Sequence, residues 1–154
     1  MNLLFPPTDR FSVPGTEADG ILHRLIGNLS GFVYRRRHDP SWTMEYLSAA
    51  CRDLTGYDPH RFIDNASLTF SDLIAPADRE HVDRQVGFAI ARRQRAAVEY
   101  RLRTAYGDWV RVEDRLTPII DEAGQVVAIE GVIDRARTRR APMAAANLVC
   151  PLPA

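Results

Sequence analysis

The sequence predicts an α+β domain, in which a single antiparallel sheet of five strands carries helices on one face. Two extended segments come first, several helical segments follow, and three longer extended segments complete the pattern. The turns between neighbouring extended segments are short enough for β-hairpins, which make antiparallel neighbours. We therefore expect the helices to lie between strands two and three, with one further helix ahead of the first strand.

The length and charge of the chain limit its function. Its 154 residues correspond to one domain with tails. The 20 basic residues, all arginine, balance 20 acidic residues, which argues against a basic nucleic-acid binder and a polybasic membrane-surface protein. Without lysine there is no Schiff-base or phosphate-loop lysine. No apolar run is long enough to span a bilayer, so the sequence predicts a cytoplasmic protein.

The N-terminal part contains an arm and a helix. Residues 1–16 hold three prolines and a Pro-Gly pair, which predicts an arm. Residues 17–30 repeat apolar side chains at helical spacing. Such a stripe either packs against its own domain or pairs with a second copy of the chain. The candidate dimer stripe consists of Leu22, Leu25, Ile26 and Leu29.

A hairpin and a short helix are predicted next. Residues 32–37 and 42–47 read as two strands joined by the turn 38–41. Ser48 is placed to cap a short helix, and Gly56 is placed to end it in the left-handed conformation.

Two helical turns and a longer helix follow. The turns are predicted at 59–63 and 70–74, and Pro76 fits the first turn of the long helix. This helix is expected to pack one apolar face on the sheet. That face consists of Val82, Val86, Ala89 and Ile90.

Three strands complete the domain, and one of them carries an inward-facing carboxylate. The strands cover residues 98–103, 109–120 and 126–133. Alternation places Asp114 on the same inward face as Val112 and Leu116. A buried carboxylate needs an Arg or Tyr partner, or its pKa rises. Asp114 therefore has either a structural hydrogen bond at the sheet or a functional role.

The arginines are expected on the solvated surface. Arg35, Arg36 and Arg37 stand in a row on the first strand. The arginines of the later strands can pair across strands with acidic neighbours such as Glu99 and Glu113.

Five motifs in order along the chain resemble one family. They are the first hairpin from Tyr34-Arg35 to Tyr46-x-Ser48, Leu54-Thr55-Gly56-Tyr57 with Pro59, Asp72-Leu73-Ile74-x-Pro76-x-Asp78-Arg79, Glu99-Tyr100-Arg101 with Val112-Glu113-Asp114-Arg115, and Ile129-Glu130-Gly131-Val132-Ile133. Their order resembles the PAS sensory domain family, in particular the subgroup found in bacterial histidine kinases and diguanylate cyclase or phosphodiesterase proteins. The resemblance covers 31–136 and leaves 137–154 as an Arg-, Ala- and Pro-rich tail or linker, expected to be disordered.

The resemblance implies a PAS fold with a cavity between the inner sheet face and the helices. Such a domain is a sensory module and not an enzyme. It binds a small ligand, forms a dimer, or does both, and so regulates an effector in the same or another protein. A mostly apolar lining favours a small, mostly uncharged ligand. The predicted lining is Tyr46, Leu54, Ile74, Val86, Ile90, Tyr100, Val112, Asp114 and Ile129.

The resemblance also implies a signal exit at Asp134. Members of this subgroup usually end in Asp-Ile-Thr or Asp-Val-Thr, where the domain couples to the next helix. Here the chain reads Asp134-Arg135-Ala136. Either Asp134 takes the family's Asp role one residue early, or the motif is lost.

Few residues of this sequence indicate a cofactor or a catalytic function. The sequence has no His or Cys spacing typical of a metal site, and we expect the domain to bind no cofactor. His81 is the one candidate haem ligand and reads as a surface residue. Cys51 lacks the motif of flavin-binding relatives and reads as a small core residue. The alternatives are a ligand-free dimerisation module and, more remotely, a cone-fold isomerase that uses Asp114 with Tyr100.

Overall fold

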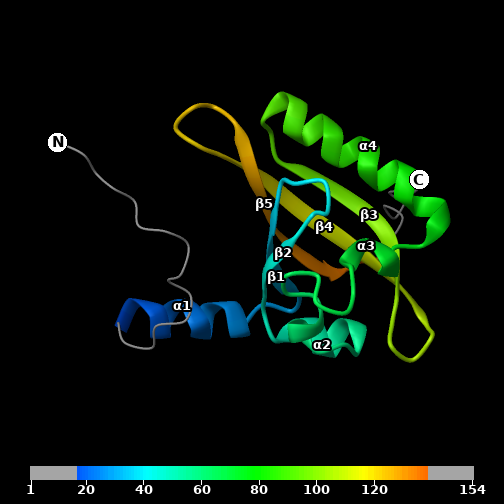
Figure 1. The fold of residues 1–154 in the computed structure, drawn as a ribbon. Coiled ribbons are helices and arrows are strands. Elements are labelled where there is room, and N and C mark those ends of the chain that lie inside the picture. The colour runs from blue at the N-terminus through cyan, green and yellow to red at the C-terminus, as the bar shows by residue number, and fades with distance from the viewer. Residues whose placement is uncertain (1–16, 139–154) are drawn as a thin grey trace, which may run out of the picture.

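The computed structural model describes residues 17–138, which form one sheet with helices beside it (Figure 1). The strand order is β2-β1-β5-β4-β3, and every neighbouring pair is antiparallel. The predicted α+β class and the five-stranded antiparallel sheet are therefore confirmed. The strands are β1 (Phe32–Arg37), β2 (Met44–Leu47), β3 (Ala96–Arg103), β4 (Trp109–Ile120) and β5 (Val126–Arg135).

The helices occupy the predicted places in the chain. Along the chain, α1 comes before β1 and the other helices come between β2 and β3. In space, α4 runs along β3 (Figure 1). Proline takes the first helical turn of α4, as expected. The helices are α1 (Glu17–Gly27), α2 (Ala50–Thr55), the 3-10 turn η2 (Pro59–Arg61), α3 (Phe70–Leu73) and α4 (Pro76–Arg92).

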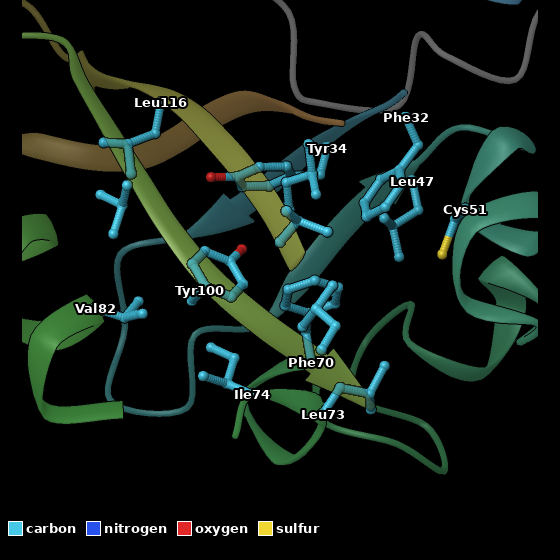
Figure 2. Close-up of a cluster of buried hydrophobic side chains, with 14 of the residues drawn as sticks. Phe32, Tyr34, Leu47, Cys51, Phe70, Leu73, Ile74, Val82, Tyr100 and Leu116 are labelled. Atoms are coloured by element: carbon cyan, nitrogen blue, oxygen red, sulfur yellow. The ribbon is translucent and has the colours of Figure 1, made fainter. Parts of the chain in front are cut away.

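The core lies between the inner sheet face and the helices that follow β2. Alternate residues of β3 and β4 are buried, as their sequence pattern predicts. Phe70 packs edge to face against Phe32 and Phe62, with ring centres 6.2 and 5.9 Å apart. Figure 2 shows this core, with Cys51 at its α2 end.

β2 is shorter than predicted and its alternation is broken. Trp42 has φ +48°, a left-handed conformation that bulky residues rarely adopt, so the strand begins only at Met44. A bulge between Arg35 and Arg36 shifts the pairing of β1 with β2. As a result Met44 and Leu47 are both buried, although three positions separate them.

The prediction that Ser48 caps α2 is wrong. Its Oγ accepts a hydrogen bond of 3.0 Å from the N–H of Val33. The residue before α2 is Ala49, which makes no side-chain capping bond. The hydroxyl therefore joins the end of β2 to β1 rather than starting the helix.

Gly56 ends α2, as predicted. Its φ is +78°, and its N–H donates to the carbonyl of Arg52 at 2.8 Å. A Cβ added at Gly56 would lie 2.8 Å from the ring of Tyr106. Both the backbone conformation and the close approach of the β3–β4 turn therefore require glycine here.

We expect Gly56→Ala to lower the free energy of unfolding by about 1–2 kcal/mol, because alanine is strained at positive φ and meets Tyr106. Gly87→Ala is the matched control, because this α4 glycine has open space around it. It should raise the free energy of unfolding by about 0.5–1 kcal/mol. Urea unfolding measures both, and equal effects of the two substitutions would contradict this account of Gly56.

Candidate functional site

A buried carboxylate lies at the centre of the inner sheet face. Asp114 on β4 is only 3% exposed. The hydroxyl of Tyr34 on β1 donates to both carboxylate oxygens, at 3.0 and 3.1 Å. The hydroxyl of Tyr100 on β3 donates to Oδ2 at 3.1 Å. Three strands are thus joined by one side chain, and the tyrosine partner that the sequence analysis required is present twice.

A glycine on β5 lets Tyr34 reach this carboxylate. β5 lies between β1 and β4, so the ring of Tyr34 must cross it. A Cβ at Gly131 would lie 2.7 Å from Cε1 of Tyr34 and 2.8 Å from its hydroxyl oxygen. Because glycine has no side chain, Gly131 leaves the space in which the Tyr34 ring reaches Asp114 from β1.

Burial governs the acidity of this cluster. It raises the pKa of Asp114 to about 6, whereas the charge of Arg36 and the two tyrosine hydrogen bonds act to lower it. Burial and the nearby carboxylate raise the pKa values of Tyr34 and Tyr100 well above 10, so both remain hydroxyl donors at neutral pH.

Arg36 is buried, which corrects its assignment to the solvated surface. It faces inward on β1 and is 7% exposed. Its guanidinium carbon lies 4.6 Å from the ring centre of Trp42 and 5.8 Å from that of Tyr34. Nε of Arg36 is buried and finds no hydrogen-bond partner among the described residues. A buried donor without an acceptor is costly, so this atom marks an incomplete part of the cluster.

The structure brings most of the predicted cavity residues together. One core cluster contains Leu54, Ile74, Val86, Tyr100, Val112 and Ile129, with Ile90 packed against it at the side. Figure 2 labels Ile74 and Tyr100 in this cluster. Asp114 is buried on the same face.

Tyr46 does not lie with the other predicted cavity residues. It pairs with Arg35 across the strands and is half-buried on the outer face of the sheet. The bulge in β1 places it there, because Glu45 and Tyr46 both turn outward. Tyr46 therefore belongs to the surface beside α1 and not to the core.

The outer face of the sheet has a hollow of about 350 Å³ next to α1. Ile26 of α1 is one wall, and the rest comes from β1, β2, β4 and β5. The other stripe residues do not line this hollow and are exposed, Leu22 by 48%, Leu25 by 58% and Leu29 by 43%. The lining is Ile26, Val33, Tyr34, Arg35, Tyr46, Arg115, Thr117, Glu130, Gly131 and Val132.

Asp134 joins the two ends of the domain. It lies near the end of β5 and accepts a hydrogen bond from the hydroxyl of Ser30, between α1 and β1. Its other oxygen accepts from the N–H of Arg135 at 2.7 Å. The predicted exit residue is thus bonded to the segment that carries α1.

The candidate cofactor residues lie apart from each other. His81 is exposed on α4. Cys51 is buried in the core, where burial raises the pKa of its thiol to about 11. Within residues 17–138, no group of three metal-type side chains comes together, and no helix has the length and apolar character to cross a bilayer. The arm predicted at 1–16 lies outside the described residues, and so does the predicted tail at 137–154 apart from its first two residues.

Sequence reasoning found Asp114 and Tyr100 but missed Tyr34, Arg36 and Trp42. Strand alternation was the available signal, because Phe32, Tyr34 and Arg36 share one face of β1. The run of three arginines masked it, because an arginine row is usually solvated.

We expect Asp114→Asn to remove a pH dependence of stability. The folded protein binds the Asp114 proton more tightly than the unfolded chain, so this carboxyl stabilises the fold at low pH. That contribution is lost as the pH rises from 3.8 through about 6. Relative to the variant, the wild type should lose roughly 3 kcal/mol of unfolding free energy across this range.

Urea unfolding at a series of pH values measures this difference. Asp78→Asn is a control of opposite sign, because Arg101 lowers the pKa of Asp78 and that contribution is lost as the pH falls. A pH-independent difference between wild type and Asp114→Asn would contradict the burial argument.

Known proteins share this architecture. A family model described as PAS fold matches residues 44–133, more than half of the chain. The match begins at β2, so β1, with Tyr34 and Arg36, lies outside it. No curated protein matches the sequence.

Three solved structures, among others, share the fold. The PAS domain of a protein from Colwellia psychrerythraea has a TM-score of 0.66 and 18% identity, over 78% of this chain and 98% of that chain. A sensory box histidine kinase/response regulator from Burkholderia thailandensis gives 0.60 and 24%, over 75% and 83%. The N-terminal domain of a diguanylate cyclase with a PAS/PAC sensor from Marinobacter aquaeolei gives 0.59 and 17%, over 68% and 94%.

The family match and the shared fold agree with the order of elements, the antiparallel sheet and the helices between β2 and β3. The PAS fold that the motifs predicted is confirmed. The chain therefore belongs to the PAS family of sensory domains.

Proposed function

We propose that this PAS domain works as a homodimeric sensory module, whose interface is formed by α1 and the outer face of the sheet. The exposed apolar stripe of α1 is the observation that carries the proposal. Leu22 and Leu25, with Leu29 in the turn that follows, are each more than two-fifths exposed on one short element. A helix of 11 residues with this composition gains stability mainly by packing its apolar face.

The sheet offers a matching surface. Ile26 covers only one side of the outer hollow, and Val33 and Val132 supply apolar floor beside it. Nearby charges are already paired, because Arg35 binds Glu45 at 2.9 Å and Glu130 at 2.6 Å. A neutral, partly apolar surface suits a second copy of the chain, which brings its own apolar stripe to the shared interface.

The hydrogen bond between Ser30 and Asp134 supports a route for the signal. It fastens the start of β1 to the end of β5, so a change in the sheet moves α1 and the chain after Asp134 together. In this proposal the domain regulates an effector, in the same or another protein, by changing how two copies pack. Catalysis is not part of its role.

The input that we favour is a small ligand held in the core. The observation that favours it is the unpartnered Nε of the buried Arg36. This donor lies next to the Tyr100–Asp114 pair, so we add a hydrogen-bond acceptor to the small, mostly uncharged ligand expected from the sequence. We infer an uncharged molecule with a hydrogen-bond acceptor, whose apolar part lies among side chains such as Ile74 and Val86.

We expect Leu25→Glu to convert a dimer into a monomer in sedimentation velocity experiments, because a carboxylate cannot be buried in the apolar interface. Phe88→Glu is the matched control, because Phe88 is similarly exposed but lies on α4. It should leave the dimer intact. A monomeric wild type, or equal dissociation by both substitutions, would contradict the interface.

We expect a screen of uncharged amides and ketones to contain compounds that raise the melting temperature of the wild type but not of Arg36→Met. The lost guanidinium is the donor that such acceptors need. Arg52→Met, at an arginine that is 63% exposed on α2, should respond like the wild type. Stabilisation that is equal in all three proteins would show that Arg36 does not bind the ligand.

A further inference from the structure

The side chains around Asp114 are arranged so that one proton more or less on its carboxyl changes their hydrogen bonds. Its carboxylate receives three hydrogen bonds from two tyrosines and none from Arg36. Asp114, Tyr34 and Tyr100 are each at most 4% exposed, so none of them exchanges freely with water. Any change of charge at this point must be answered inside the core.

We propose that Asp114 is a proton-binding site whose occupancy is transmitted through Arg36 to Trp42, so that the domain responds to pH. This inference goes beyond the proposed dimer and the proposed ligand, and it depends on neither. The chemical signal is the proton itself, taken from water by the carboxylate.

The hydrogen bonds to the two oxygens of Asp114 favour Oδ1 as the atom that binds the proton. Tyr34 donates to both oxygens of Asp114, whereas Tyr100 donates only to Oδ2. When a proton binds at Oδ1, that oxygen becomes a donor. The Tyr34 hydroxyl then accepts from Oδ1 and can donate only toward Oδ2. Tyr100 keeps its bond to Oδ2. The proton therefore acts chiefly on β1, the strand that also carries Arg36.

Neutral Asp114 leaves Arg36, whose Nε is already buried without an acceptor, without the nearby negative charge. Its positive charge is then costly in the core, and the direction open to Arg36 is toward the half-buried ring of Trp42, over which it already lies. Trp42 holds a strained conformation with φ +48°, in a turn fastened by Asp39, whose carboxylate accepts from the N–H and hydroxyl of Thr43. The β1–β2 turn is therefore the element that the proton would shift.

The surroundings single out Arg36 as the charge that Asp114 faces. β1 presents Tyr34 and Arg36, and β3 presents Tyr100. The side chains that β4, β5 and α4 contribute to this core are apolar, and include Leu116, Ile133, Val82 and Val86. The carboxyl has a pKa of about 6, which brings its proton exchange into the range of cellular pH changes.

Trp42 provides the readout. In a chain carrying Trp109→Phe and His38→Gln, Trp42 is the sole tryptophan, and the imidazole whose ring centre lies 5.3 Å from it is gone. The indole N–H signal in a ¹H–¹⁵N spectrum is then followed across the pH range. We expect it to shift with a midpoint near 6.

Three further substitutions in this background decide the outcome. Asp114→Asn should abolish the shift. Tyr100→Phe should raise the midpoint by about half a pH unit or more, because it removes a hydrogen bond that lowers the pKa of Asp114. Tyr106→Phe is the matched control, at a tyrosine that is 82% exposed, and should leave the midpoint unchanged.

Two results would overturn the proposal. One is a Trp42 shift that persists in Asp114→Asn, and the other is a midpoint that is the same in Tyr100→Phe and Tyr106→Phe. If Asp114→Asn fails to fold, the pair of tyrosine variants decides alone, because Phe fills the space of Tyr100 and keeps the core packed.

Discussion

The buried carboxylate of Asp114 is the constraint on which the inner face of this PAS domain depends. It receives hydrogen bonds from β1 and β3 while standing on β4, so it fixes the positions of three of the five strands. Gly131 follows from it, because a side chain there would block Tyr34. The inward position of Arg36 also follows, because a buried anion is tolerated only with compensation nearby.

Replacing such a cluster with apolar side chains is often neutral or stabilising, so stability alone does not explain it. In the function that we propose, these polar groups make the core responsive to a bound ligand or proton. One donor, Nε of Arg36, lacks an acceptor among the described residues, and one acid has its pKa near 6. Both features sit beside β1, whose start is fastened to the end of β5 through Ser30 and Asp134. β1 therefore connects the polar cluster around Asp114 to the exposed helix α1.

Much of this fold could be predicted from the sequence, because its longest elements obey simple periods. Alternation fixed the inward face of β3 and β4, and with it the burial of Asp114. The parts that sequence reasoning missed are places where a local rule breaks. A bulge turned Tyr46 outward, a positive φ removed Trp42 from β2, and Ser48 bonded to β1 instead of capping α2. Arg36 was missed because its neighbours Arg35 and Arg37 are surface residues of ordinary kind.

The protonation of the Asp114 carboxyl shows whether the core holds a buried acid that binds a proton near neutral pH. Carbon-detected NMR of aspartate-labelled protein, with the Asp114 carboxyl identified from a variant that lacks it, measures that protonation without any reporter. We expect a midpoint near 6 for this one carboxyl. A midpoint at or below the ordinary value of 3.8 would show that the core does not hold a buried, proton-binding carboxylate.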